Sequence, residues 1–231
     1  MTVPSKILLG RGSPRSNIRE VESLNESLPC DKLIVRFVGE YKAYMIMKDE
    51  FMKRPDYTHL VLATDDIVVK PEHIVQLQKD LDEFDYPVIS GMMNVDQDDD
   101  VHVNLTWELP IKDRKHRQYN NIRREMIADE PDIFQVAFSG FPLMAIRRDI
   151  VKPYIFAADK VFQGFPPYRG ASLDLVFCWY CKENNIPVMV DKRIDMKHLR
   201  ASGTNRVGKK HTKVEYWHDG IIEQISRAEL R

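Results

Sequence analysis

The sequence predicts an α/β fold, a single Rossmann-like domain with a mostly parallel central sheet flanked by helices. Short apolar runs of strand length alternate with segments whose apolar residues recur at helical spacing, and this order favours parallel strands joined by helices that cover the sheet. Several of these runs are apolar without alternation, as in strands buried on both faces. The 231 residues can bury the core of one domain, and no internal repeat or low-complexity linker divides them.

The first half of the chain supplies most of the regular elements. After Glu40, apolar residues fall on one face of a helix, and Pro71 suits the first turn of another. Gly10 ends the first apolar run, and a turn is expected at residues 11–15. The predicted strands are 6–10, 33–38, 60–63 and 88–92, and the predicted helices are 40–53 and 71–84.

The second half is less regular. Residues 96–100 hold four aspartates, and a solvated hairpin turn is preferred there to a calcium loop, because the glycine and terminal glutamate of such a loop are missing. Residues 113–126 are very polar and are expected to form an exposed helix or a loop that faces substrate. The other predicted elements are strands at 101–109, on either side of a turn at 139–142, at 186–190 and at 194–198, and helices at 173–184 and 216–230.

Composition excludes several classes of function. A net charge of −1 gives the whole chain no attraction to nucleic acid, and no recognised motif interleaves its basic residues with aromatic ones. No apolar run is long enough to span a bilayer, and no N-terminal segment has the order of a signal peptide. Three cysteines argue against a disulfide scaffold and for a reducing, cytoplasmic environment. Cys178 and Cys181 have the spacing of a metal or redox pair, but their apolar neighbours favour buried core thiols.

Adjacent carboxylates at Asp65 and Asp66 directly follow an apolar run at 59–63 and Thr64. Two charges at the end of a buried strand cost free energy unless something satisfies them, and a divalent cation with phosphate ligands would do so. Ligands of open α/β sheets also bind at the carboxyl ends of the strands. The alternative is an acidic turn that caps the helix beginning at Pro71.

The segment Thr64-Asp65-Asp66 resembles the metal-binding Asp-x-Asp signature of GT-A fold glycosyltransferases, family-2-like members of the nucleotide-diphospho-sugar transferase superfamily. The likeness extends over residues 6–199. It implies that Asp66 binds Mn²⁺ or Mg²⁺ and that Asp65 lies at the donor nucleotide. Thr64 stands where the family has its first aspartate, which removes the carboxylate of the usual ribose or second metal contact.

Two further residues match the pattern of this family. Asp174, at the start of a predicted helix, matches the aspartate that serves inverting members as general base, although Leu173 replaces the glutamate that usually precedes it. His198, after the last core strand, matches the histidine that many members place on the same metal as the Asp-x-Asp motif. The alternatives are an aspartate that caps its own helix and a histidine without a metal.

The resemblance also assigns donor and acceptor residues. The donor nucleotide is expected near the ends of the first two strands and near a basic residue ahead of the acidic motif. The acceptor is expected near the turn at 139–142, which also fits a plain β-hairpin, and near aromatic rings, which are more often core. The donor set is Gly10, Arg11, Gly39, Lys48 and Asp65, the acceptor set is Trp107, Gly140 and Phe141, and Phe165 and Tyr168 are further aromatic candidates.

These matches imply a metal-dependent glycosyltransferase that moves a sugar from a nucleotide-diphosphate donor to an acceptor hydroxyl with inversion. Residues 1–95 would be the donor-binding half, 96–199 the acceptor-binding half, and 200–231 a basic loop with a terminal helix. The acceptor class stays open between a glycan, a lipid-linked and a protein acceptor, and formation of a homo-oligomer stays open too. The basic loop is expected to fold over the diphosphate, with contact to an anionic membrane surface as its alternative.

Two other functions fit parts of the sequence. The segment Gly10-Arg-Gly-Ser-Pro-Arg15 partly matches the Gly-rich basic loop of a sugar-phosphate nucleotidyltransferase, which would act on a nucleoside triphosphate. Thr64 and Leu173 both depart from the glycosyltransferase pattern, and a binding or assembly module without turnover would show such departures. Activity with a triphosphate, or nucleotide binding without transfer, would select between these alternatives.

Overall fold

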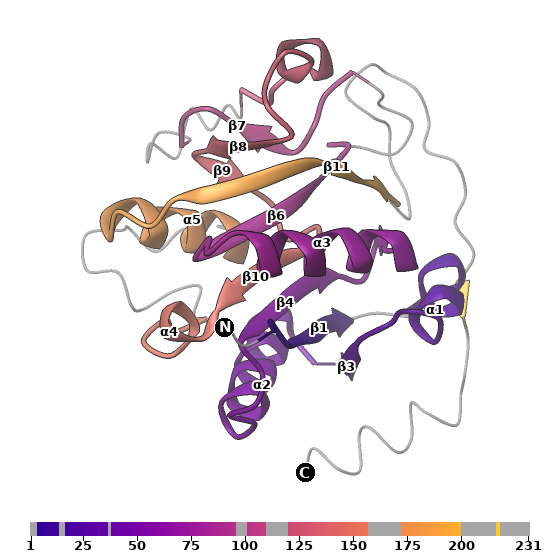
Figure 1. Cartoon of the computed structure of the whole chain (residues 1–231). Coiled ribbons are helices and arrows are strands. Elements are labelled where there is room, and N and C mark those ends of the chain that lie inside the picture. The colour runs from indigo at the N-terminus through magenta and orange to yellow at the C-terminus, as the bar shows by residue number, and fades with distance from the viewer. Residues whose placement is uncertain are drawn as a thin grey trace.

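The computed structural model describes residues 4–13, 17–36, 38–95, 101–109, 120–156, 172–199 and 216–217, which form a central sheet covered by helices (Figure 1). The first elements are the strands β1 (Ile7–Ser13), β2 (Asn17–Ile18), β3 (Asp31–Arg36), β4 (His59–Thr64), β5 (Ile67–Val68) and β6 (Val88–Met93) and the helices α1 (Arg19–Asn25), α2 (Glu40–Met52) and α3 (Pro71–Glu83). The later elements are the strands β7 (Leu105–Thr106), β8 (Ile133–Val136), β9 (Phe138–Ser139), β10 (Met144–Arg147), β11 (Val188–His198) and β12 (Tyr216–Trp217), the 3₁₀ turn η1 (Arg124–Ile127), and the helices α4 (Arg148–Val151) and α5 (Leu173–Glu183).

The main sheet has the strand order β3-β1-β4-β10-β6-β11-β5, and β8 pairs with β11 outside this path. Strands β3, β1, β4, β6 and β11 run in one direction, because β1 is parallel to β3 and β4, β11 is parallel to β6, and β10 is antiparallel to both β4 and β6. The predicted α/β fold with a mainly parallel central sheet is therefore confirmed. The sequence does not reveal that β10 runs in reverse at the centre, because an apolar run carries no direction.

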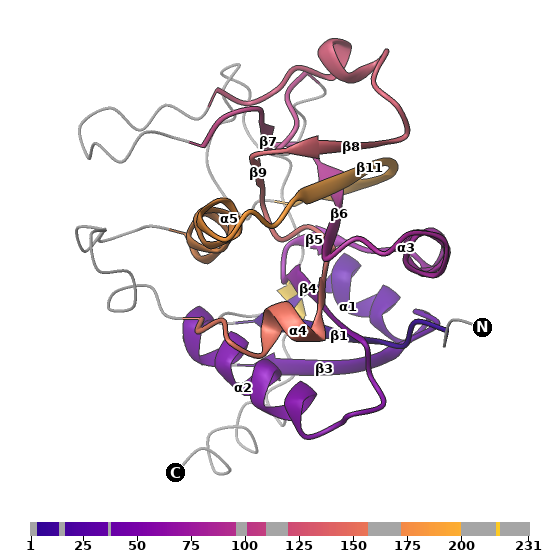
Figure 2. The same cartoon turned by 60° about the vertical axis from the view of Figure 1, so that its left-hand side comes forward.

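Two apolar layers lie on opposite faces of the sheet. Figure 2 shows α3 on one side of the sheet and α2 and α5 on the other. On β4, Leu60 and Leu62 pack into the layer with α2 and α5, whereas Val61 and Ala63 pack into the layer with α3. Both faces of this strand are buried, which explains why its sequence is apolar without alternation.

Strand β1 continues beyond its predicted end. A turn was expected at 11–15, but Arg11 pairs with Ile34 on one side and Ala63 on the other, and the strand ends at Ser13. Neighbouring strands on both sides satisfy the backbone groups here, and this pairing outweighs the turn tendency of glycine and serine.

Other predictions depend on strand pairing and are also corrected. No hairpin forms at 139–142, because β9 pairs with β7 whereas β10 pairs with β4 and β6. The strands predicted at 186–190 and 194–198 are one strand, β11, whose register against β6 shifts between Val190 and Asp195. Tyr216 and Trp217 pair with β2 instead of beginning a helix. The elements predicted at 96–100, 113–119, 200–213 and 218–230 lie outside the described residues.

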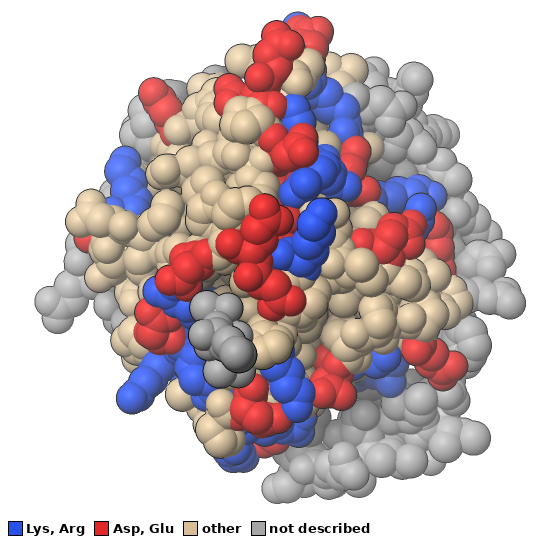
Figure 3. Space-filling model, viewed as in Figure 1, with Lys and Arg blue, Asp and Glu red and all other residues tan. Residues whose placement is uncertain are grey.

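The charged side chains form no single-sign surface on the face that carries α3. Figure 3 shows lysine and arginine interspersed with aspartate and glutamate there, in line with the net charge of −1. Among the described residues, no helix is long and apolar enough to cross a membrane.

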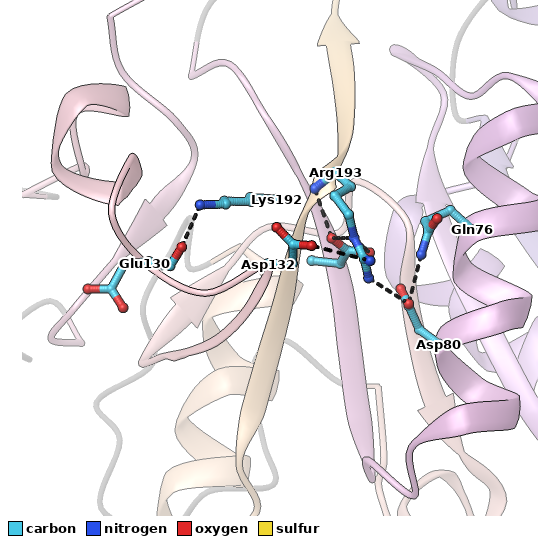
Figure 4. Close-up of polar contacts among 7 residues, drawn as sticks. Gln76, Asp80, Glu130, Asp132, Lys192 and Arg193 are labelled. Atoms are coloured by element: carbon cyan, nitrogen blue, oxygen red, sulfur yellow. Dashed lines mark hydrogen bonds and ion pairs between the residues drawn. The ribbon is translucent and has the colours of Figure 1, made fainter.

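A buried polar cluster joins α3 to β11 (Figure 4). Asp80 and Asp191 are 1% and 0% exposed, and Arg193 contacts both: its Nη2 lies 2.9 Å from Asp80 Oδ1 and its Nε lies 2.9 Å from Asp191 Oδ1. Gln76 Nε2 donates to Asp80 Oδ1 over 2.8 Å. Burial, followed by the hydrogen bond and the charge of Asp191, raises the pKa of Asp80 to about 7. The single positive charge of Arg193 is shared by two buried carboxylates. Because its pKa is raised, Asp80 retains its proton in mildly acidic solution.

Candidate active site

The acidic pair Asp65 and Asp66 lies in the turn between β4 and β5, at the carboxyl end of β4. Thr64 Oγ1 donates a hydrogen bond of 2.8 Å to Asp66 Oδ1. Asp65 is buried, and the side chain of Asp66 is 16% exposed. The pair thus has the position at the end of a buried strand that the sequence predicts, and Thr64 orients the carboxylate of Asp66.

Arg11 supports this turn from inside the protein. Its side chain is 1% exposed, and its Nη1 donates to the carbonyl oxygens of Thr64 and Ile67, over 3.1 and 3.0 Å, which bracket the acidic pair. Burial lowers the pKa of Arg11 to about 10, against the opposing effect of Glu22, Asp65 and Asp66, so the guanidinium is charged at neutral pH. Arg11 therefore fixes the turn and offsets its negative charge, and its predicted contact with the nucleotide stays a prediction.

Strand β11 brings His198 to the same turn. His198 Nε2 lies 3.4 Å from Asp66 Oδ2, and His198 Nδ1 lies 3.0 Å from the carbonyl oxygen of Val95. A carbonyl oxygen only accepts hydrogen bonds, so Nδ1 carries a proton, and Nε2 of the neutral ring then turns its lone pair toward a carboxylate oxygen. Two electron-rich atoms, His198 Nε2 and Asp66 Oδ2, would then repel each other. A proton on Nε2 or a cation between the two atoms would remove this repulsion.

The two side chains fit part of the coordination shell of a divalent cation. A ligand histidine usually donates its other N–H to a carbonyl or carboxylate, as His198 does to Val95. Neighbouring ligands of an octahedral ion at about 2.1 Å lie about 3 Å apart, close to the separation of Asp66 and His198. In the described part of the chain, no group of three or more His, Cys, Asp or Glu side chains could hold a metal ion. The described side chains would therefore share such an ion with substrate oxygens or water.

Asp174 lies in the first turn of α5. Its Oδ1 accepts a hydrogen bond of 2.7 Å from the backbone N–H of Leu175. Burial raises the pKa of Asp174, whereas hydrogen bonds from Ser172 and Leu175 act in the opposite direction. A carboxylate with a raised pKa is a stronger base, and the bond to Leu175 is also what the helix-cap alternative requires, so one geometry serves both roles.

Gly140 lies against the carboxylate of Asp174. A Cβ at this position would lie 3.3 Å from Asp174 Oδ2 and would overlap Asn104 Nδ2. This close approach is the physical reason for glycine here. The structure thus brings a predicted acceptor residue to the predicted base. It adds Asn104, which no local sequence signal identifies because it follows from the approach of two irregular segments.

Tyr44 lies among the acidic residues of both predicted sites. Its pKa is raised well above the ordinary value by burial first, and then by the charges of Glu40, Asp174, Asp66 and Asp65. The charges of the acidic turn and of Asp174 thus both act on this one phenol. By its spacing Tyr44 belongs to the apolar face of the helix predicted at 40–53, and the sequence gives no other signal for it.

Three predicted donor residues have structural partners of their own. A Cβ on Gly10 would lie 2.6 Å from Met47 Sδ, so glycine allows α2 to pack on β1. Gly39 is the exposed residue that precedes α2, and its carbonyl oxygen accepts a hydrogen bond from Ala43 N. Lys48 donates through Nζ to the carbonyl oxygens of residues 152 and 154. These contacts account for the three residues without a nucleotide, and their donor role stays a prediction.

The aromatic candidates occupy different environments. Phe141 is buried and packs edge-on against Tyr44, with ring centroids 5.5 Å apart, as a core residue does. Trp107 is 40% exposed and lies on a separate groove, described below. Phe165 and Tyr168 are outside the described residues.

The cysteines of α5 have the environment of core thiols. Cys178 and Cys181 are buried and unbonded to each other, and burial raises the pKa of both thiols, that of Cys181 to about 12. Cys178 Sγ also lies 3.5 Å from the carbonyl oxygen of Ser139. The preferred interpretation of this pair as structural is therefore confirmed.

A groove of about 1040 Å³ lies at the opposite end of β4 from the acidic turn. Its lining includes His59, at the start of β4, whereas Asp65 and Asp66 follow the end of that strand. Burial, followed by the charge of Arg147, lowers the pKa of His59 to about 4, so the ring is neutral there.

Comparison with known proteins identifies solved structures with a similar fold. No family model matches the sequence, and no curated protein matches it. Among solved structures, A197 from STIV is similar with a TM-score of 0.56 and 14% identity, over 93% of this chain and 97% of that chain. The inositol-1-phosphate CTP transferase from T. maritima matches with a TM-score of 0.45 and 9% identity, over 99% of this chain and 97% of that chain. At these identities the first match shows a shared fold, and the second is too distant to support an argument.

Proposed function

We propose that the protein is a metal-dependent glycosyltransferase of the GT-A type, which moves a sugar from a nucleotide-diphosphate donor to an acceptor hydroxyl with inversion. The observation that carries this proposal is the approach of His198 Nε2 to Asp66 Oδ2, 3.4 Å apart at the carboxyl end of a buried strand. A site with two electron-pair donors at the end of a strand suits a cation whose remaining ligands a diphosphate supplies.

The chain's own residues have distinct parts in this proposal. Asp66 and His198 would hold Mn²⁺ or Mg²⁺, which when bound neutralises charge growing on the diphosphate leaving group. Arg11 keeps the acidic turn in place through the carbonyl groups of Thr64 and Ile67. Asp174 would take the proton of the acceptor hydroxyl as that oxygen attacks the anomeric carbon, and its raised pKa favours this role.

Calorimetric titration of UDP and then GDP, with and without Mn²⁺, tests the donor site. We expect binding of one diphosphate that requires the metal and that is lost in Asp66→Ala. Binding of a nucleoside triphosphate with turnover of a sugar phosphate would instead select a nucleotidyltransferase. No binding of either diphosphate under any metal condition would reject the donor site.

Asp174→Asn separates catalysis from binding. This variant keeps a hydrogen-bond acceptor for Leu175 N and removes the base, so we expect unchanged diphosphate affinity and loss of sugar transfer. Transfer at the wild-type rate would exclude Asp174 as the base. Diphosphate binding in the wild type without transfer to any acceptor would favour a binding or assembly module.

A further inference from the structure

A second groove, of about 870 Å³, lies between the carboxyl end of α5 and the strands β7 and β8. Its apolar lining includes buried residues of β8, α5 and β11, namely Val136, Cys178, Cys181 and Val188. Its exposed polar side chains are Glu108, Gln135, Lys182 and Asn185. The groove therefore combines an apolar floor with hydrogen-bonding groups at its rim, as small-molecule sites do.

Trp107 is the exposed aromatic residue of this groove. It is 40% exposed, and its ring centroid lies 5.6 Å from that of Phe134, with the ring planes tilted by 53°. The contact with Phe134 holds the indole in place at the surface. A fixed, exposed indole offers a large contact area at a small cost in conformational entropy.

Strands β7 and β9 connect this groove to the candidate base. At one end of the pair, Asn104 and Gly140 lie against each other beside Asp174. At the other end, Trp107 and Ala137 line the groove. The two strands are antiparallel, and three residues along a strand span about 10 Å. The groove therefore lies about 10 Å along the strand pair from Asp174, a distance that a few linked sugar rings match.

We propose that this groove binds a neutral oligosaccharide, and that the acceptor is a glycan whose terminal sugar lies at Asp174 and whose next sugars lie against Trp107. The acceptor role rests on the proposed function. A sugar ring has an apolar C–H face that packs on an indole, and its hydroxyl groups exchange hydrogen bonds with amides such as Gln135 and Asn185. Among the described residues the rim carries one carboxylate, Glu108, and one ammonium, Lys182, and this balance favours an uncharged chain over a lipid phosphate.

Saturation-transfer NMR with cellotetraose, chitotetraose, maltotetraose and mannotetraose tests this site on the full chain. We expect at least one tetrasaccharide to bind, and Trp107→Ala to weaken that binding about tenfold, the equivalent of one aromatic contact. Trp107→Phe should retain part of the affinity, because a smaller ring remains. The matched control is Phe84→Ala, which removes another exposed aromatic ring, one stacked on Tyr86 at a centroid distance of 5.3 Å.

The outcomes separate this inference from the proposed function. No binding of any tetrasaccharide up to about 10 mM, or binding that Trp107→Ala leaves unchanged, would overturn the glycan site. Titration of the same variants with a nucleoside diphosphate is an independent measurement. Trp107→Ala should leave the diphosphate affinity unchanged. Glycan binding without diphosphate binding would support the glycan site in the groove and reject the glycosyltransferase function. Diphosphate binding without glycan binding would reject the glycan site alone.

Discussion

His198 Nε2 lies 3.4 Å from Asp66 Oδ2, although one residue ends β11 and the other follows β4. The antiparallel pairing of β5 with β11 sets His198 opposite Ile67, next to Asp66 in the chain. The backbone bond from Leu199 N to the carbonyl oxygen of Asp66, 2.7 Å long, fixes this approach. Backbone pairing alone therefore brings the two side chains together, before any ligand is considered.

His198→Ala should weaken metal-dependent binding of a nucleoside diphosphate. We expect a loss of at least about tenfold, since removal of even an outer-shell partner of a metal costs 10–100-fold. Calorimetric titration in Mn²⁺ measures it. Lys197→Ala is the control, because Lys197 is exposed on the same strand and forms a surface ion pair with Glu20. Equal affinity in wild type and His198→Ala would assign His198 to a salt bridge with Asp66 and remove it from the metal site.

Arg11→Met should destabilise the protein. The substitution keeps much of the side-chain volume, but it removes the two hydrogen bonds to the turn and the positive charge beside Asp65 and Asp66. We expect a loss of about 3 kcal/mol in the free energy of unfolding, measured by urea denaturation. Arg11→Lys keeps the charge and should lose less of the free energy of unfolding. Mn²⁺ should reduce the loss in Arg11→Met, because the ion supplies positive charge at the turn. A stability of Arg11→Met equal to that of the wild type would contradict this account.

Alanine should be tolerated better at Gly140 than at Gly91. A Cβ on Gly91 would lie 2.6 Å from Ile194 Cγ2 and 2.8 Å from the backbone oxygen of Ile194, so two paired strands would have to separate. We expect Gly91→Ala to cost about 3 kcal/mol of unfolding free energy. At Gly140 the overlapping atom is the end of the Asn104 side chain, which rotates away, so the cost should be about 1 kcal/mol. Thermal denaturation compares the two, and a larger loss at Gly140 would refute this assignment.

Asp80→Asn should remove a pH dependence of stability. The pKa of Asp80 is about 7 in the folded protein against an ordinary value of 3.8, so between these values the folded state holds a proton that the unfolded state releases. This contribution is therefore full below pH 3.8 and is lost as the pH rises to about 7. Asparagine stays neutral, so the variant should match the wild type in stability below about pH 4 and should exceed it increasingly up to about pH 7, by as much as about 4 kcal/mol for a pKa difference of about 3. Melting temperatures across this range measure the difference, and parallel profiles of the two proteins would contradict it.

Local sequence signals predict the helices α2, α3 and α5 and the type of sheet well. The helices predicted at 40–53 and 71–84 agree with α2 and α3 to within one residue, because Pro71 and the spacing of apolar residues are local features. Errors arise where a distant strand decides the outcome. The extension of β1 to Ser13 requires β3 and β4, and the pairing of Tyr216 with β2 requires a partner early in the chain.

The candidate site also contains some residues that local sequence signals identify and others that only the packing of distant segments brings there. Asp66 and His198 could be proposed together because each matches a motif position, and the structure brings them within 3.4 Å. Tyr44 and Asn104 could not be found, because only the packing of α2 and the approach of β9 place them near acidic side chains. Lys48 is assigned from its spacing alone, and no local pattern predicts the two backbone carbonyls that its ammonium group contacts.

The reversed strand β10 at the centre of the sheet determines when the protein can fold during synthesis. Residues 144–147 lie between β4 and β6, so until this late segment has left the ribosome β4 has one unpaired edge, and β6, whose other neighbour is the still later β11, has two. Unpaired edges of buried, apolar strands are sites of aggregation. The N-terminal half alone therefore lacks a complete sheet, and a nascent chain of that length depends on continued translation, or on a chaperone, to protect its exposed edges.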